Sequence, residues 1–284
     1  MERKEILIAG LPNSGKTTYL GALVHILDSG EVNTALKYDS DPENRKYLNK
    51  IVNSWLKFER MERTLYSSEE FIELNLLDNN ERISLRIPDL SGETWKEIWS
   101  ERQCNQKVAN LIESVDCMMF FIHCDNIEKP ISIMEMLRQQ KALGEVQPEG
   151  EIKDWEPDRH CSTQVMLVDI LQVIAEINKT KSPINLAIIL SAWDTVEDLD
   201  CTPEEFIHSK LPLLSQYLQS GHDYPNFKIY GVSAQGANLD LKGQELEEQI
   251  QKLNAMELTS KRVKILSDID YKHDLSIPIK KLLK

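Results

Sequence analysis

Residues 10–17 carry a chemical signal that few other stretches of the sequence approach. They read Gly-Leu-Pro-Asn-Ser-Gly-Lys-Thr and match the pattern G-x-x-x-x-G-K-[ST] in full. Glycines let such a loop curl until its N–H groups face phosphate oxygens, which Lys16 also reaches, and the Thr17 hydroxyl is a ligand for Mg²⁺. The residues expected to hold a nucleotide's phosphates are Pro12, Asn13, Ser14, Gly15, Lys16, Thr17 and Thr18.

The elements on either side of this loop are of the right type. Residues 5–9 are an apolar run typical of a buried strand, and residues 17–27 space their leucines along one helical face. The helix N-terminus then adds its dipole to the phosphate site. The alternative is an accidental glycine-rich turn, or a relic of such a loop that no longer binds nucleotide.

A second candidate lies in residues 84–93, Ser-Leu-Arg-Ile-Pro-Asp-Leu-Ser-Gly-Glu. Asp89 follows a predicted strand and is placed to hold Mg²⁺ through water, while the backbone N–H of Gly92 could sense a γ-phosphate. Asp-x-x-Gly is also a common turn. The functional interpretation therefore depends on its place one hairpin after the phosphate loop.

The rest of the chain alternates short apolar runs with amphipathic segments, which predicts an α/β protein with a mostly parallel sheet. Further strands are expected at 70–77, 82–87, 117–123, 184–191, 227–232 and 262–266. Further helices are expected at 41–58, 93–114, 163–178, after Thr202, at 244–253 and from 276. Residues 125–160 hold prolines and glycines with little periodicity, which indicates a surface insertion.

Two later strand ends resemble those of the translation-factor-related class of P-loop GTPases. In that class one strand ends in Asn-Lys-x-Asp and a later one in Ser-Ala-Lys. Here residues 188–194 read Ile-Ile-Leu-Ser-Ala-Trp-Asp and residues 229–235 read Ile-Tyr-Gly-Val-Ser-Ala-Gln, in the expected order. The resemblance implies that Asp194 pairs with guanine N1 and N2. It also implies that the base O6 meets the backbone of Ser233, Ala234 and Gln235.

The first of these boxes departs from the class. Ser191 and Ala192 replace Asn and Lys, so we expect the loss of the Asn tether and of the Lys stem that stacks on the base. Trp193 either belongs to the core or helps to wall the base. The acceptor oxygens of Asp194 suit guanine N1–H and N2–H and favour guanine over adenine.

The class also closes a Thr on Mg²⁺ and γ-phosphate from the loop before its second strand. Thr64 is the candidate and Thr34 the rival, and Arg63 could supply an arginine to the transition state, unless these side chains simply face solvent. Glu93 stands where the class usually has the Gln that orients water. A carboxylate accepts a proton but donates none, which implies slow or partner-dependent hydrolysis by a site of Lys16, Arg63, Thr64 and Glu93.

The finer resemblance is to the bacterial double-GTPase group, a branch proposed to act in multi-gene conflict and phage-defence systems. It rests on residues 8–20, 88–93, 191–194 and 273–283. It implies a three-layer P-loop NTPase fold, with helices on both faces of a mostly parallel six-stranded sheet that has one antiparallel strand. It also implies a GTP/GDP ligand and Mg²⁺.

The boxes at residues 10 and 233 must meet on one ligand, so we expect a single GTPase domain over residues 1–284. The excess length falls in insertions at about 30–69 and 125–160 and in a terminal helix at about 276–284.

Composition narrows the partners. Thirty-three Lys and Arg against 46 Asp and Glu give a net charge of −13, which argues against duplex DNA or an anionic membrane as the main partner, although a local basic face is compatible with it. Five widely spaced cysteines without a Cys-x-x-Cys pair indicate neither a disulfide framework nor a zinc ribbon. No apolar run approaches the roughly 20 residues of a membrane helix. We expect a cytoplasmic protein.

Three functions fit these residues. The leading hypothesis is a GTP-hydrolysing switch read by a protein partner. The others are a nucleotide-binding scaffold with little or no turnover, which Glu93 and the altered base box favour, and an ATPase.

Overall fold

The apolar runs of the sequence assemble into a single sheet in the computed structural model. The structure describes residues 3–60, 71–79, 81–88, 92–130, 134, 138, 161–181, 183–267 and 270–284. Within these residues the strands are β1 (Arg3–Gly10), β2 (Lys37–Tyr38), β3 (Ile72–Asp78), β4 (Glu81–Ile87), β5 (Cys117–His123), β6 (Asn185–Ser191), β7 (Phe227–Ser233), β8 (Lys264–Ser267) and β9 (Asp270–Lys272).

The strand order is β2-β3-β4-β1-β5-β6-β7-β8-β9. Strands β4, β1, β5, β6 and β7 are parallel, and β3 runs antiparallel beside β4. This six-stranded part confirms the predicted sheet and fold class. The strand expected at 262–266 is β8, which pairs antiparallel with β7. The described sheet is wider than expected because β2 and β9 also extend its two edges through antiparallel pairs. These two strands have two and three residues, too few for a clear period-2 pattern.

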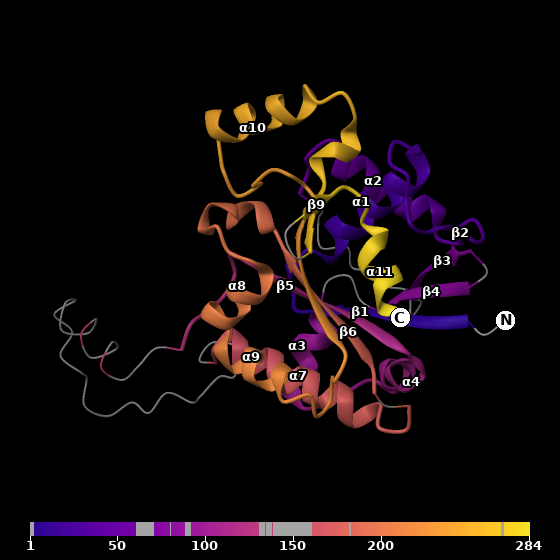
Figure 1. Ribbon diagram of the computed structural model, residues 1–284, viewed down its shortest axis with the longest axis vertical. Coiled ribbons are helices and arrows are strands. Elements are labelled where there is room, and N and C mark those ends of the chain that lie inside the picture. The colour runs from indigo at the N-terminus through magenta and orange to yellow at the C-terminus, as the bar shows by residue number, and fades with distance from the viewer. Residues whose placement is uncertain are drawn as a thin grey trace.

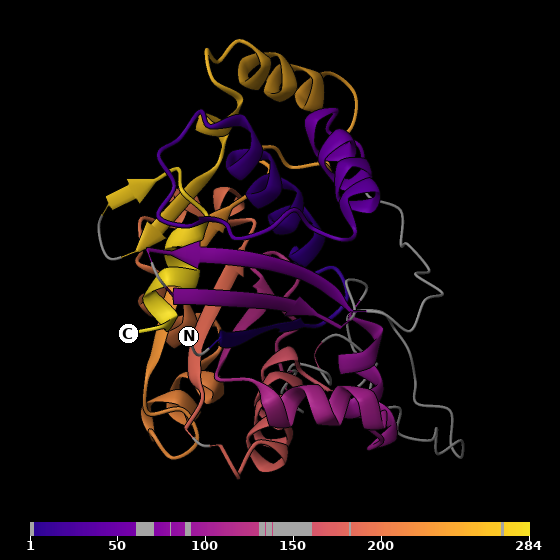
Figure 2. The same ribbon diagram turned by 90° about the vertical axis from the view of Figure 1, so that its right-hand side faces the viewer.

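Helices cover both faces of the sheet, as expected (Figure 1). They are α1 (Lys16–Ser29), α2 (Arg45–Leu56), α3 (Glu93–Glu101), α4 (Gln106–Ser114), α7 (Thr163–Ile177), α8 (Pro203–Lys210), α9 (Pro212–Gln219), α10 (Gln244–Asn254) and α11 (Ser276–Leu282). One core joins α1, α2 and α11 to the sheet, and the other joins α3, α4, α7, α8 and α9 to its opposite face. Figure 2 shows α10 standing at one end of the molecule, with no fully buried residue. No helix among the described residues is long and apolar enough to span a membrane.

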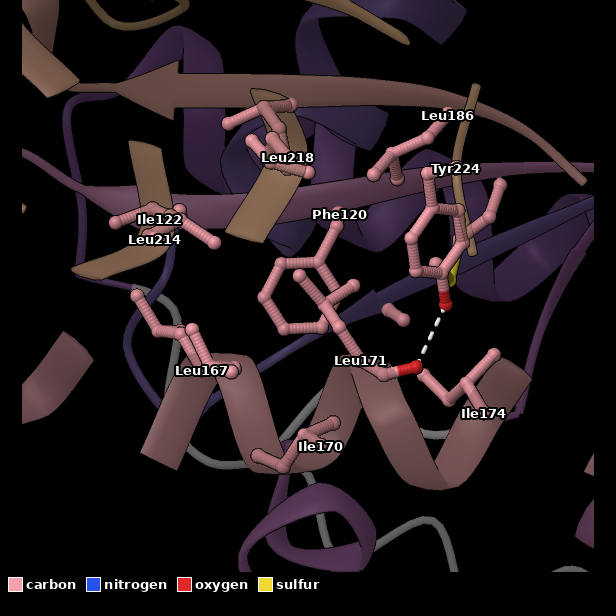
Figure 3. Close-up of a cluster of buried hydrophobic side chains, with 14 of the residues drawn as sticks. Phe120, Ile122, Leu167, Ile170, Leu171, Ile174, Leu186, Leu214, Leu218 and Tyr224 are labelled. Atoms are coloured by element: carbon pink, nitrogen blue, oxygen red, sulfur yellow. Dashed lines mark hydrogen bonds between the residues drawn. The ribbon is translucent and has the colours of Figure 1, made fainter. Parts of the chain in front are cut away.

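The alternation of β1 shows how the sequence builds two cores at once. Leu7 and Ala9 lie in the core beside α7, whereas Ile6 and Ile8 lie in the core beside α1. In Figure 3 the leucines and isoleucines of α7 pack on Phe120, and the Tyr224 hydroxyl donates a 2.8 Å hydrogen bond to the main-chain oxygen of Leu171. Each fully buried side chain of this size stabilises the fold by about 1.5–3 kcal/mol. Because successive residues of a central strand enter opposite cores, the central strands are apolar on both faces.

The single helix predicted over residues 93–114 is two helices, α3 and α4. Helix α3 ends because Arg102 takes a left-handed conformation with φ of +55°. Helix α4 begins after Asn105, whose side chain caps it by accepting a 2.8 Å hydrogen bond from Lys107 N. The Asn105 side chain was the available signal for this second start. The predicted start after Thr202 is confirmed, with a capping box between Thr202 and Glu205.

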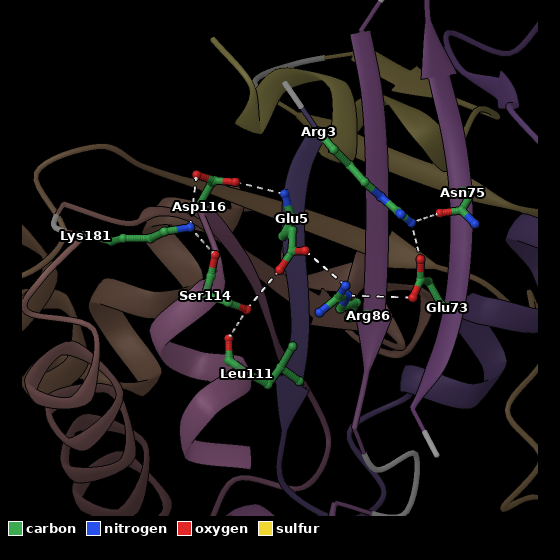
Figure 4. A network of polar contacts seen from close by, with 9 residues as sticks. All are labelled: Arg3, Glu5, Glu73, Asn75, Arg86, Leu111, Ser114, Asp116 and Lys181. Carbon is green, nitrogen blue, oxygen red and sulfur yellow. Dashed lines mark hydrogen bonds and ion pairs between the residues drawn. The ribbon is translucent and has the colours of Figure 1, made fainter. Parts of the chain in front are cut away.

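A network of charged side chains crosses β3, β4 and β1 on one face of the sheet (Figure 4). Arg86 pairs with Glu5 at 3.0 Å and with Glu73 at 3.7 Å. The Glu5 carboxylate also accepts a 2.9 Å bond from the Ser114 hydroxyl. These partly exposed pairs contribute little stability each. The loops discussed below follow the carboxyl ends of β1, β6 and β7.

Candidate functional site

The phosphate-binding loop is built between β1 and α1. Gly15 has φ of +86° and precedes the first residue of α1, so the helix N-terminus begins inside the loop. Lys16 is 2% exposed, and its Nζ donates to the main-chain oxygens of Gly10 at 2.7 Å and Leu11 at 2.9 Å. It also lies 3.2 Å from the Ser14 hydroxyl. The ammonium therefore lies within the loop, where bound phosphates could replace these oxygens.

Gly92 brings the start of α3 against this loop. Its φ is +82°, and a Cβ at this position would lie 2.6 Å from Leu11 C and Pro12 N and 2.7 Å from Gly10 O. No side chain fits there. Two helix N-termini, those of α1 and α3, therefore meet at the loop, and Glu93 is the first residue of the second one. Positive dipole ends placed together favour an anion.

A pocket of about 150 Å³ adjoins the loop. Its lining comes from α1, the turn after β6 and the loop after β7. The lining residues are Gly15, Thr18, His123, Ser191, Ala192, Asp194, Thr195, Ala234, Gln235, Ala237, Asn238, Leu239 and Asp240. Because the carboxyl ends of parallel strands share one edge, the boxes at 188–194 and 229–235 reach the same pocket.

Asp194 reaches the pocket through a tight turn. Ala192 has φ of +53° and starts the 3₁₀ turn η1 (Trp193–Thr195), and the Thr195 hydroxyl donates to Ala192 O at 2.7 Å. This turn reverses the chain directly after β6 and places Asp194 in the pocket wall.

Ser191 retains a tether that we expected to be lost. Its hydroxyl donates a 2.8 Å hydrogen bond to the main-chain oxygen of Ser14, from β6 to the phosphate-binding loop. A Cβ at Gly15 would lie 2.8 Å from Ser191 Cβ and Oγ. The expectation was wrong because a short hydroxyl suffices where a glycine lets the loop approach β6.

Trp193 lies in the core rather than in the pocket wall. Its side chain is 2% exposed and stacks edge-on against Phe206, with ring centroids 5.5 Å apart. A Cβ at Gly231 would lie 2.5 Å from the indole. Of the two interpretations of Trp193, the structure supports core packing, and placing its side chain at the base was wrong.

His123 is a pocket residue that the sequence did not single out for nucleotide binding. It ends β5, and its Nδ1 accepts a 3.2 Å bond from Asp125 N. Burial lowers its pKa, against the opposing effect of Asp125, Asp240 and Asp194. The ring is therefore neutral near pH 7, with its proton on Nε2.

Several other predicted residues can be placed. Ser14 and Ser233 are buried, at 3% and 2% exposure, and Thr17 and Pro12 are half-buried in the loop. Asn13 takes φ of +59° and is exposed. Thr34 does not line the pocket, and its hydroxyl donates to Leu36 O at 2.7 Å. Arg63, Thr64 and Asp89 lie outside the described residues.

This arrangement defines a P-loop nucleotide-binding protein of the α/β class. The family model described as Double-GTPase 1 matches residues 7–282, so the chain belongs to the Double-GTPase 1 family. The predicted resemblance is confirmed. It is a GTP-binding P-loop protein by that membership.

Solved structures with a similar fold are GTPases or GTPase-like. The Arl6 (BBS3) small GTPase of Trypanosoma brucei with a bound nucleotide analogue is 10% identical, with 92% of this chain and 99% of that chain covered and a TM-score of 0.36. The Ski7 GTPase-like domain of S. cerevisiae, bound to GDP and inorganic phosphate, is 15% identical, with 91% and 51% covered and a TM-score of 0.44.

A bacterial selenocysteine-specific elongation factor, EF-Sec, is 15% identical, with 90% and 30% covered and a TM-score of 0.33. This chain thus spans about half of the Ski7 chain and under a third of the EF-Sec chain. No curated protein sequence matches it. Similarities this low carry no functional meaning of their own.

Proposed function

We propose that this chain is a Mg²⁺-dependent, GTP-hydrolysing molecular switch formed by a single domain. One observation carries the proposal: the phosphate-binding loop, the start of α3 and a pocket containing Asp194 adjoin one another at the carboxyl edge of the sheet. In this proposal Lys16 and the loop amides hold the phosphates, and Asp194 reads the guanine edge.

Magnesium fits the donors at this place. Mg²⁺ binds through one or two protein oxygens together with substrate phosphates and keeps several waters, so it needs no dedicated cage. Among the described residues, no group of three or more Asp, Glu, His or Cys side chains is arranged so that it could hold a metal ion by itself. The Thr17 hydroxyl, at the second position of α1, is the donor we propose, together with Asp89 and Thr64. The ion would neutralise charge on the β- and γ-phosphates.

The switch would work through Gly92. Its backbone lies against the phosphate-binding loop and is also the cap of α3. A γ-phosphate bonded to the Gly92 N–H therefore has a direct route to the position of α3, and its loss on hydrolysis releases that bond. Glu93 and Arg63 are the residues we propose to act on the attacking water and on the transition state.

A protein partner would read this change. The family resemblance favours a place in a bacterial multi-protein defence or conflict system. The net charge of −13 argues against direct binding of DNA, and the scattered cysteines favour the cytoplasm.

Replacing Lys16 by Ala tests the site. We expect GTP binding, measured by calorimetry with Mg²⁺ present, to disappear, because no other described cation lies in the loop. Lys252→Ala, on the exposed helix α10, is the matched control and should bind as the unmodified protein does. Micromolar affinity retained by Lys16→Ala would refute the assignment.

Glu93 favours a second candidate, a scaffold subunit that holds GTP without turnover, because it occupies the position of the water-orienting Gln. Phosphate release from GTP, measured with Mg²⁺ present and with and without candidate partners, separates the two. Release by the isolated chain or with a partner supports the switch, and persistent absence supports the scaffold.

A further inference from the structure

The carboxyl end of α2 is hydrogen-bonded to the loop that follows β7. Trp55 is fully buried, and its Nε1 donates a 2.8 Å bond to the main-chain oxygen of Ala234. Gln235 Nε2 donates in return to Trp55 O at 3.2 Å. Ala234 and Gln235 both line the pocket that contains Asp194. Helix α2, from the insertion at 30–69, therefore contacts the backbone of two residues that line the pocket.

The same segment reaches the far end of that loop. Arg60 donates to the main-chain oxygen of Leu239 through Nε at 3.2 Å and Nη2 at 2.9 Å, and it pairs with Asp240. Leu239 and Asp240 also line the pocket. Trp55 and Arg60 thus hold the loop after β7 near its start and near its end.

A buried cation fixes the indole of Trp55. The Arg262 guanidinium lies 3.5 Å from the Trp55 ring centroid and 4.5 Å from that of Phe58, and its Nη2 donates to Trp55 O at 2.8 Å. Burial lowers the pKa of Arg262 to about 10, so it stays charged at neutral pH. A charge that is 3% exposed is costly to place here, whereas its contacts hold one orientation of the indole.

The bond to Ala234 O sets the direction of a peptide group. Because the peptide unit is planar and trans, its N–H points away from its C=O. With the Ala234 oxygen turned toward Trp55, the Gln235 N–H is turned away from it. Hydrogen bonds to the edge of a base discriminate only when donors are held to within about 0.5 Å.

We propose that Trp55, oriented by Arg262, is a positioning residue for guanine selectivity: it holds the Ala234–Gln235 peptide group at the pocket. This rests on the proposed function, which puts the base in that pocket. Trp55 would then affect the choice of base far more than the binding of phosphates, which the proposed function assigns to Lys16 and the loop amides.

The test compares GTP with ATP. Dissociation constants for both are measured by displacing a fluorescent GTP analogue from the full chain, with Mg²⁺. Trp55→Phe keeps an aromatic face for Arg262 but removes the N–H donor. We expect GTP to bind about five- to tenfold more weakly, the effect of one net hydrogen bond, with ATP changed less than about twofold.

Trp99→Phe is the matched control. Trp99 is 5% exposed in the core on the opposite face, and its Nε1 has no hydrogen-bond partner among the described residues. It should lower the melting temperature without changing the ratio of the GTP and ATP constants. A ratio unchanged in folded Trp55→Phe overturns the proposal.

If Trp55→Phe does not fold, the same ratio is measured for Arg60→Ala, whose side chain is 65% exposed. A smaller preference for GTP over ATP in Arg60→Ala supports the positioning of the loop after β7, and an unchanged preference overturns the proposal. Failure of the unmodified chain to bind GTP through Lys16 refutes the proposed function. If every variant binds GTP with the same preference over ATP as the unmodified chain, only the role of Trp55 is refuted.

Discussion

The hydroxyl of Ser191 lies 2.8 Å from the main-chain oxygen of Ser14, and this contact joins the end of β6 to the phosphate-binding loop. The absence of a side chain at Gly15 makes the approach possible. Ser191, the last residue of β6 before the turn that carries Asp194, therefore also contacts the phosphate-binding loop. In the proposed site, this buried hydrogen bond would couple base recognition to phosphate binding.

Ser191→Ala should weaken GTP binding about three- to tenfold, since one buried hydrogen bond contributes about 1 kcal/mol. Calorimetry measures the loss. Ser209→Ala is the matched control, because the Ser209 hydroxyl makes a comparable 3.1 Å bond to Phe206 O on α8, away from the pocket. Equal affinities of the two variants would contradict the role of Ser191.

Gly92→Ala should destabilise the fold more than Gly30→Ala. Both glycines have positive φ, +82° and +65°, so each alanine bears a left-handed strain of about 1 kcal/mol. Only at Gly92 would the Cβ strike backbone atoms, at 2.6 Å, whereas nothing lies within 4 Å at Gly30. The clash should add about 1–3 kcal/mol.

Urea unfolding measures the two free energies. We also expect Gly92→Ala to lose affinity for GTP, because α3 must move away from Leu11 and Pro12. Equal losses of stability in the two variants would show that α3 does not depend on the close approach.

Asp194→Asn should shift nucleotide preference from guanosine toward xanthosine. The amide offers one donor and one acceptor where the carboxylate offers two acceptors, which suits a base that carries an oxygen in place of the N2 amino group. Competition of labelled GTP by XTP measures the shift. Unchanged selectivity would remove Asp194 from the base site.

His123 should make stability depend on pH. Burial lowers its folded pKa below the unfolded value of about 6.5, so between these two values the unfolded chain binds more protons. The contribution of His123 to the free energy of unfolding therefore rises with pH through this window, and it is constant below the folded pKa and above the unfolded one. Denaturant unfolding at a series of pH values measures the slope.

His123→Gln should flatten that slope, because glutamine does not titrate. The exposed His208 on α8 supplies the matched control, His208→Gln. A slope identical in His123→Gln and the unmodified chain would contradict the burial argument.

Local patterns were sufficient for most of the fold. The positions of the six central strands along the chain follow from apolar runs, and the start of α8 follows from Thr202 and Pro203. The break between α3 and α4 was missed because the amphipathic pattern continues across Arg102, whose left-handed backbone no periodicity reveals. The short edge strands β2, β8 and β9 were missed or misjudged in length because pairing with a neighbour defines them more than their own residues do.

By itself the sequence determined the phosphate-binding loop, the central strands and the positions of the base-reading boxes, because each depends on residues adjacent along the chain. The tertiary structure alone decided that Ser191 reaches Ser14, that Trp193 packs in the core and that Trp55 supports Ala234. Residues 55 and 234 are far apart in the chain. Their contact depends on how α2 packs beside α1 on one face of the sheet, and no local pattern encodes that packing.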